Sequence, residues 1–245
     1  MSRFSVVLSG FERYENIGQN PSRLVMEALE NRGISGLPED ISADLTTVLL
    51  PLSFEKAWSV LKETIDRAEP QIVIATGFKR NAGSISLERC ALNRVEMPQS
   101  GVKTSDRRMP EGRMPEGRTS NGIVADINPS ENTAPIIESA PAAYWTGIPL
   151  HEILNSFAQN NIPATLSSDA GIYICNSLFF RLLDAASKNK NMTAGFVSLP
   201  QVVQDRSDRG GLPKECIISA IENVIATSAD FYRRQDSAEG ILRAE

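Results

Sequence analysis

The residue best suited to covalent chemistry in this sequence is Cys175. It follows an extended apolar run that turns at Ala170 and Gly171 and leads into a helical pattern, CNSLFFRLLDAA. A cysteine at a helix start lies near unpaired backbone N–H groups and the positive end of the helix dipole, which favour thiolate over thiol. The one histidine of the chain, His151, lies on a different segment. The sequence therefore predicts a reactive thiol without its usual proton carrier.

The overall composition excludes several classes of protein. The 245 residues, 41% of them hydrophobic, suffice for one large α/β domain spanning 1–245. A net charge of -5 without a basic stripe argues against nucleic acid as a partner. Three cysteines without a CxxC pair or a histidine cluster indicate neither disulfides nor a metal site, and we expect no cofactor; Cys90 and Cys216 lie in apolar patterns typical of a core. The first apolar run is too short for a signal sequence or a membrane span, so we expect a soluble, cytoplasmic protein with no membrane partner.

Short β-rich runs alternate with helical patterns along the chain. Strands are expected at 4–9, 45–50, 72–76, 162–167 and 195–199, and helices at 55–68, 150–159, 175–188 and 214–234. This alternation predicts a single-domain, three-layer α/β/α fold with a mainly parallel sheet. Ligands bind such folds beyond the carboxyl ends of the strands, so chemistry is expected in the loops that follow them.

One polar stretch interrupts the alternation. Residues 99–140 are rich in Pro, Gly, Ser and Arg and contain MPEGR twice, at 109–113 and 114–118. A connection of this length without periodicity is either a lid or a disordered insertion, and its composition favours the surface loop.

Five segments share a pattern with a known family. They are SGFERYENIGQNPS at 9–22, SISLERCALN at 84–93, PAAYWTGIPL at 141–150, SSDAGIYICNSLFF at 167–180 and AGFVSLP at 194–200. In order and spacing they resemble pyrrolidone-carboxylate peptidases, the pyroglutamyl-peptidase I family of cytoplasmic cysteine peptidases. The resemblance runs nearly end to end outside 99–140. It implies the pyroglutamyl-peptidase-like (phosphorylase/hydrolase-like) fold, and because family members often form homo-oligomers, homo-oligomerisation is expected.

The resemblance also implies a set of catalytic positions. The family nucleophile, in AG-x-x-x-CN, falls on Cys175, and the triad carboxylate, in a PER-like motif, falls on Glu88. The histidine of the family's GF-x-H-x-P motif falls on Ser198, because this chain has GFVSLP at 195–200.

Substrate-binding positions follow from the same resemblance. The aromatics and the Asn of the first loop, which hold the pyroglutamyl ring in the family, match Phe11, Tyr14 and Asn20. A Gly-rich turn of the family is GFKRNAGS here, which puts Phe78 where the backbone helps to hold the lactam. The family's oxyanion Arg has no clear counterpart, because neither Arg94 nor Glu96 aligns with it.

The serine changes the expected chemistry. A hydroxyl does not titrate near neutral pH, so Ser198 cannot take the thiol proton or protonate a departing amine. Two hypotheses follow. The chain is either a cysteine-dependent hydrolase or acyl-transfer enzyme acting on a small molecule or an N-terminally blocked peptide through a Cys175 thioester, or a catalytically inactive homologue that binds a ligand or another subunit.

Four of these residues also have ordinary structural interpretations. Glu88 is either a triad member or a solvated charge at a strand end. His151, after Pro149, is expected at the surface, and Asp169 is expected to begin the turn before Cys175. Trp145 is expected to pack into the fold, as large aromatics usually do.

Overall fold

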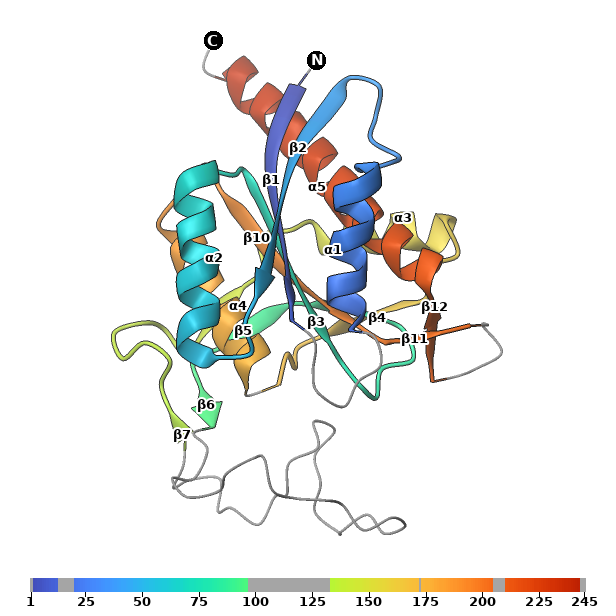
Figure 1. Cartoon of the computed structure of the whole chain (residues 1–245). Coiled ribbons are helices and arrows are strands. Elements are labelled where there is room, and N and C mark those ends of the chain that lie inside the picture. Colours follow the sequence, from blue (N-terminus) through green and yellow to red (C-terminus); the bar gives the residue numbers. More distant parts are fainter. Residues whose placement is uncertain (1, 13–19, 97–132, 172, 205–209, 243–245) are drawn as a thin grey trace.

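Helices cover both faces of a six-stranded sheet in the computed structural model of the chain (Figure 1). The model describes residues 2–12, 20–96, 133–171, 173–204 and 210–242. The helices are α1 (Pro21–Arg32), α2 (Phe54–Ala68), α3 (Leu150–Gln159), α4 (Ile174–Ser187) and α5 (Lys214–Leu242). The strands of the main sheet are β1 (Ser2–Phe11), β2 (Ile41–Leu50), β3 (Ile72–Phe78), β4 (Ile85–Glu88), β9 (Ala164–Ser167) and β10 (Thr193–Leu199).

The sheet is mainly parallel, which confirms the predicted α/β class. Its strand order is β2-β1-β3-β10-β4-β9, and every neighbouring pair is parallel except β10 and β4. Strand β10 is buried along its whole length, and β3 is buried up to its last residue. Both are continuous apolar runs, as strands covered on two faces require.

The two faces of the sheet carry separate apolar clusters. Ile72 and Ile74 of β3 point into one cluster, and Val73 and Ala75 point into the other, because side chains alternate along a strand. Figure 1 shows α1, α3 and α5 on the first face and α2 and α4 on the second. We call the second face the α4 face.

Local signals explain where the helices begin. Asn20 caps α1 by accepting a hydrogen bond from the Ser22 backbone N–H (3.1 Å), and Pro21 takes the first helical position. Ser53 caps α2 in the same manner, because its Oγ accepts a hydrogen bond from the Lys56 backbone N–H. Helix α1 was absent from the predicted set, while α2, α3 and α4 lie within one residue of their predicted bounds and α5 extends further than expected.

Six short strands form ladders outside the main sheet. They are β5 (Cys90–Leu92) with β8 (Ala143–Trp145), β6 (Val95–Glu96) with β7 (Thr133–Ala134), and β11 (Gln201–Val203) with β12 (Gly211–Pro213). Strand β4, which sequence periodicity did not reveal, lies between β10 and β9. Strand β9 begins two residues later than predicted, after Pro163, which has no N–H to donate to a ladder.

The predicted insertion is only partly described. The MPEGR repeat lies outside the described residues, but 133–140 belong to the fold. The amide of Asn93 holds this segment by accepting from Ile136 N (2.8 Å) and Ile137 N (3.0 Å) and donating to Ile137 O (2.8 Å) and Ala140 O (3.2 Å). The part of the predicted insertion after residue 132 is therefore fixed structure.

None of the helices in the described ranges is both long and apolar enough to cross a membrane.

Candidate active site

The register of four adjacent strands, β3, β10, β4 and β9, brings polar side chains together on the α4 face. Ser198 of β10 is paired with Gly77 of β3 and with Ser86 of β4, and Glu88 is paired with Ser167 of β9. Paired residues of neighbouring strands point to the same face, and alternate residues of one strand share a face. Gly77, Ser198 and Glu88 therefore all point toward α4. They lie near the carboxyl ends of β3 and β10, the edge at which ligands bind in folds of this type.

Cys175 reaches this cluster from the second residue of α4. It is partly buried, and its sulfur rests against Gly77. A Cβ on Gly77 would lie only 2.9 Å from Cys175 Sγ and 2.8 Å from Phe196 Cζ. The absence of a side chain at position 77 is therefore what admits the thiol.

Glu88 is the buried carboxylate of the cluster. It has 0% exposed surface, so the interpretation as a solvated strand-end charge is wrong. Ser198, itself buried, donates from Oγ to Glu88 Oε1 at 2.7 Å. The second oxygen, Oε2, is buried with no hydrogen-bond partner within the described part of the chain. A buried oxygen without a hydrogen bond costs free energy unless another group donates one to it.

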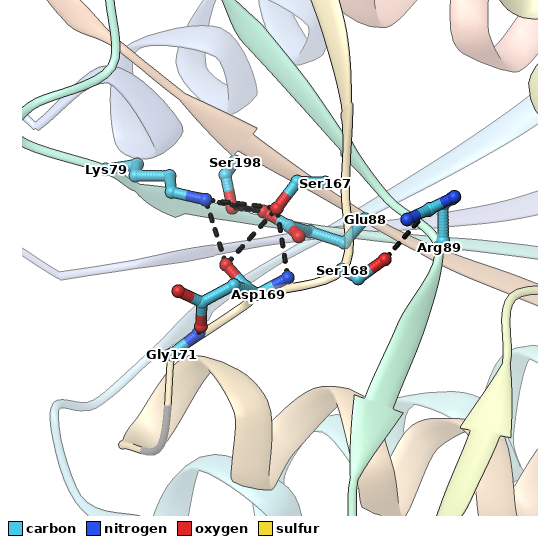
Figure 2. Close-up of polar contacts among 8 residues, drawn as sticks. All are labelled: Lys79, Glu88, Arg89, Ser167, Ser168, Asp169, Gly171 and Ser198. Atoms are coloured by element: carbon cyan, nitrogen blue, oxygen red, sulfur yellow. Dashed lines mark hydrogen bonds and ion pairs between the residues drawn. The ribbon is translucent and has the colours of Figure 1, made fainter.

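Lys79 is the residue that sequence analysis missed. It follows β3, and its ammonium donates to three acceptors from separate segments: Glu88 Oε1 (3.3 Å), Ser167 Oγ (3.2 Å) and the Asp169 backbone O (2.9 Å). Figure 2 shows the lysine pointing toward Glu88, Ser167 and Asp169. Its position in the charged turn GFKRNAGS, two residues beyond Gly77 and so on the same face, was the available signal.

The loop before α4 is shaped by its own hydrogen bonds. Asp169 Oδ1 accepts from the Gly171 backbone N–H at 2.9 Å, and Gly171 adopts φ 81°, which glycine tolerates best. This confirms Asp169 as a turn residue. Arg89, next to Glu88, donates from Nε to Ser168 Oγ at 2.8 Å (Figure 2).

The electrostatics of the site oppose ionisation of the thiol. Burial raises the pKa of Cys175 to about 12, the negative charge of Glu88 contributes to the rise, and the positive charge of Lys79 offsets part of it. The predicted preference for thiolate at the helix start is therefore wrong for the protein without substrate. The rise in the thiol pKa that desolvation causes is larger than the fall expected from the helix N-terminus.

We expect Cys175 to alkylate slowly. Only the thiolate attacks iodoacetamide, so at about pH 8 Cys175 should react at least about 100-fold more slowly than N-acetylcysteine. Its rate should still rise above pH 9, because the thiol titrates above its ordinary range. Peptide mapping after timed alkylation separates Cys175 from the other two cysteines. A rate plateau near the ordinary cysteine pKa would contradict this account.

Comparison with known proteins agrees with this geometry. The family model described as pyroglutamyl peptidase matches residues 4–231. A pyrrolidone-carboxylate peptidase of Bacillus cereus is 30% identical over 210 residues, covering 85% of this chain and 84% of the relative. The one from Bacillus cytotoxicus is 28% identical over 221 residues, covering 90% and 89%. The chain belongs to the pyroglutamyl peptidase family.

Solved structures support the same assignment. The crystal structure of pyroglutamyl peptidase I from Bacillus amyloliquefaciens matches with a TM-score of 0.70 and 27% identity, covering 93% of this chain and 97% of that one. The pyrrolidone carboxyl peptidase from Thermococcus litoralis has the same fold, with a TM-score of 0.73 over 95% and 96% of the two chains. Sequence and structural relatives thus place this chain in a family of pyroglutamyl-peptidase-like hydrolases of the cysteine peptidase class.

Three of the four predicted substrate-binding residues have defined places in this family member, and contact with a substrate stays a prediction for all four. Phe11, at the end of β1, is buried in the apolar cluster of the α4 face. Asn20 uses its whole amide structurally, since Nδ2 donates to the backbone O of Phe11 and Glu12, and Oδ1 accepts from Ser22. Phe78 is partly exposed and, by strand alternation, points away from the face of Gly77. Tyr14 lies outside the described residues.

The remaining aromatic residues of the motifs and the histidine lie either in the packed fold or at the surface. The Tyr144 hydroxyl donates to Asp184 Oδ1 at 2.9 Å and its ring packs on Phe180. Trp145 is 71% exposed, so the prediction that it packs into the fold is wrong; it faces outward from β8, a short strand paired only with β5 among the described residues. His151 is exposed, as predicted.

Asn176 connects the helix of Cys175 to the segment that follows Glu88. It is 1% exposed, accepts from Leu92 N (2.9 Å) and donates to the backbone oxygens of Leu92 (2.8 Å) and Arg94 (2.9 Å). The conspicuous CN pair of the sequence thus combines a thiol with the amide that holds its helix against β5.

Proposed function

We propose that the protein is a cysteine-dependent hydrolase or acyl-transfer enzyme that acts on an N-terminal pyroglutamyl group or a similar small lactam or acyl group. The covalent intermediate is a thioester on Cys175, with Glu88 as the neighbouring carboxylate and Ser198 in the position of the family's histidine. The substrate is a small molecule or an N-terminally blocked peptide. The expected cytoplasmic location and homo-oligomeric assembly belong to the same proposal.

One observation supports the proposal most strongly. The thiol, the buried carboxylate and the hydroxyl come from α4, β4 and β10, yet they converge on one face near the carboxyl ends of β3 and β10. Burying an ionisable carboxylate completely is costly, so its presence beside a thiol is more typical of a functional site than of packing.

The missing imidazole favours substrates with good leaving groups. When sulfur attacks an ester or thioester, the departing oxygen or sulfur scarcely needs a proton, whereas a departing amine does. An amine that enters afterwards can accept the acyl group from the thioester. Activated esters should therefore be preferred over amides, and acyl transfer is compatible with the site.

Intact-protein mass spectrometry tests the thioester. Incubation with the 4-nitrophenyl ester of pyroglutamic acid should add the mass of one pyroglutamyl group, with release of 4-nitrophenolate. The adduct should map to Cys175, should be absent from Cys175→Ala, and should persist in Cys216→Ala, in which a buried cysteine of α5 is removed. An adduct unaffected by Cys175→Ala would overturn the proposal.

The second candidate function is ligand binding without turnover. It is favoured by the raised pKa of the thiol, since a protonated sulfur is a poor nucleophile. Isothermal titration calorimetry with pyroglutamic acid distinguishes the two. Binding without any adduct from the activated ester would support this alternative and exclude the enzyme.

A further inference from the structure

We propose that Lys79 supplies the positive charge and the exchangeable proton at this site in place of an imidazole. The inference rests on the proposed function for its chemistry, but its main test needs no substrate. It starts from a lysine that follows β3 and is turned inward to three acceptors beside the nucleophile.

The contacts of Lys79 indicate a built site. A lysine side chain loses considerable rotamer freedom when it is fixed, yet here all three ammonium protons are directed to acceptors on β4, β9 and the loop before α4. The lysine side chain is 28% exposed, while Glu88 is 0% exposed. The ammonium therefore connects a buried carboxylate to the solvent-facing side of the cluster.

Lys79 and Glu88 act on the thiol with opposite signs. The negative charge of Glu88 opposes ionisation of Cys175 and the positive charge of Lys79 favours it. Two other charged residues lie nearby: the Asp169 carboxylate accepts from Gly171, and Arg89 donates to Ser168. Lys79 is thus the cation that favours thiolate here, and its ammonium, unlike a serine hydroxyl, is a charged donor that can give a proton to a departing amine.

The proton balance of amide cleavage can be written with these groups. Cys175 Sγ bonds to the acyl carbon as the thiol proton passes to Glu88 Oε2, the oxygen without a partner among the described residues. The C–N bond breaks and the amine takes a proton from the Lys79 ammonium, which Glu88 then reprotonates. Water attacks the thioester, the C–S bond breaks, and the water proton returns to sulfur through the same pair. The products are one amine and one carboxylic acid.

The test measures alkylation of Cys175 by iodoacetamide against pH in matched variants. Lys79→Met should slow the reaction at least about tenfold below the thiol pKa, because a nearby opposite charge shifts a pKa by about one to three units. Lys79→Arg, which keeps the charge, should stay within about threefold of the wild type. Glu88→Gln should accelerate alkylation, since its amide oxygen still accepts from Ser198 and Lys79 while the negative charge is removed.

Lys188→Met is the matched control. Lys188 pairs with Asp184 near the far end of α4, the helix that carries Cys175, so its loss should leave the alkylation profile unchanged. Thermal unfolding of each variant verifies folding. Should Lys79→Met not fold, Lys79→Gln, whose amide still donates, provides the same comparison.

Two outcomes decide the inference. It is overturned if the folded Lys79→Met or Lys79→Gln variant alkylates within twofold of the wild type at every pH. A lysine with a purely structural role would change the thermal unfolding temperature but not the pH profile of Cys175 alkylation. The proton role is overturned if Lys79→Arg, which cannot titrate, cleaves pyroglutamyl 4-nitroanilide as fast as the wild type. Failure of the thioester test with a normal Lys79 effect would reject the proposed function and leave the electrostatic role of Lys79 standing.

Discussion

Replacing Ser198 by histidine should raise hydrolysis of pyroglutamyl 4-nitroanilide by about 100-fold or more, the usual contribution of general acid–base catalysis. Position 198 is paired with Gly77, on which the sulfur of Cys175 rests, and its side chain already contacts Glu88. An imidazole at this position can donate one N–H to the carboxylate and direct its other nitrogen to the thiol. It would also favour the thiolate, since an imidazolium beside a thiol lowers its pKa.

The control for this experiment is Ser198→Asn, which adds comparable polar bulk but does not titrate. It should give no gain in amide hydrolysis, and Ser198→His combined with Cys175→Ala should be inactive. Initial rates of 4-nitroaniline release measure all three variants. A folded Ser198→His protein with unchanged amide hydrolysis would mean that the substrate pocket, and not the missing imidazole alone, differs from that of a pyroglutamyl peptidase.

Asn176→Ala should lower the free energy of unfolding by about 2–4 kcal/mol, because it removes three hydrogen bonds from partly buried backbone groups of Leu92 and Arg94. Those bonds tie α4 to β5, which follows the strand of Glu88, so the same change should loosen the placement of Cys175 against the carboxylate. Urea unfolding measures the stability.

Asn31→Ala is the comparison for this variant. Asn31 makes one exposed hydrogen bond, from Nδ2 to the Glu27 backbone O, and its loss should change stability by no more than about 0.5 kcal/mol. A loss below about 1 kcal/mol for Asn176→Ala would show that water replaces the amide at Leu92 and Arg94.

Much of the fold could be predicted because local patterns agree with the tertiary structure. The apolar runs at 72–76 and 195–199 are buried on both faces, and the helices at 55–68 and 150–159 present their apolar sides to the sheet. Strand β4 was harder to find. Its four residues, ISLE, include a serine and a glutamate on one side, and only pairing with β10 and β9 makes both buried.

The candidate site could be predicted only in part, because part of it depends on contacts between segments far apart in the sequence. Motifs around Cys175, Glu88 and Ser198 are visible in the sequence, but the acceptors of Lys79 lie 9, 88 and 90 residues further along the chain. No local pattern reports such contacts. The exposure of Trp145 could likewise not be predicted, because it depends on how β8 pairs with β5.

The amino-acid sequence by itself determined the α/β class, the family, the nucleophile candidate and the absence of histidine beside it. Those properties follow from residue types, their periodicity and short motifs. The tertiary structure alone decided that Glu88 is fully buried, that Lys79 pairs with it, and that burial raises the pKa of the Cys175 thiol. Each of these depends on the local dielectric and on distances between charges, which are set by the packing of segments far apart in the chain.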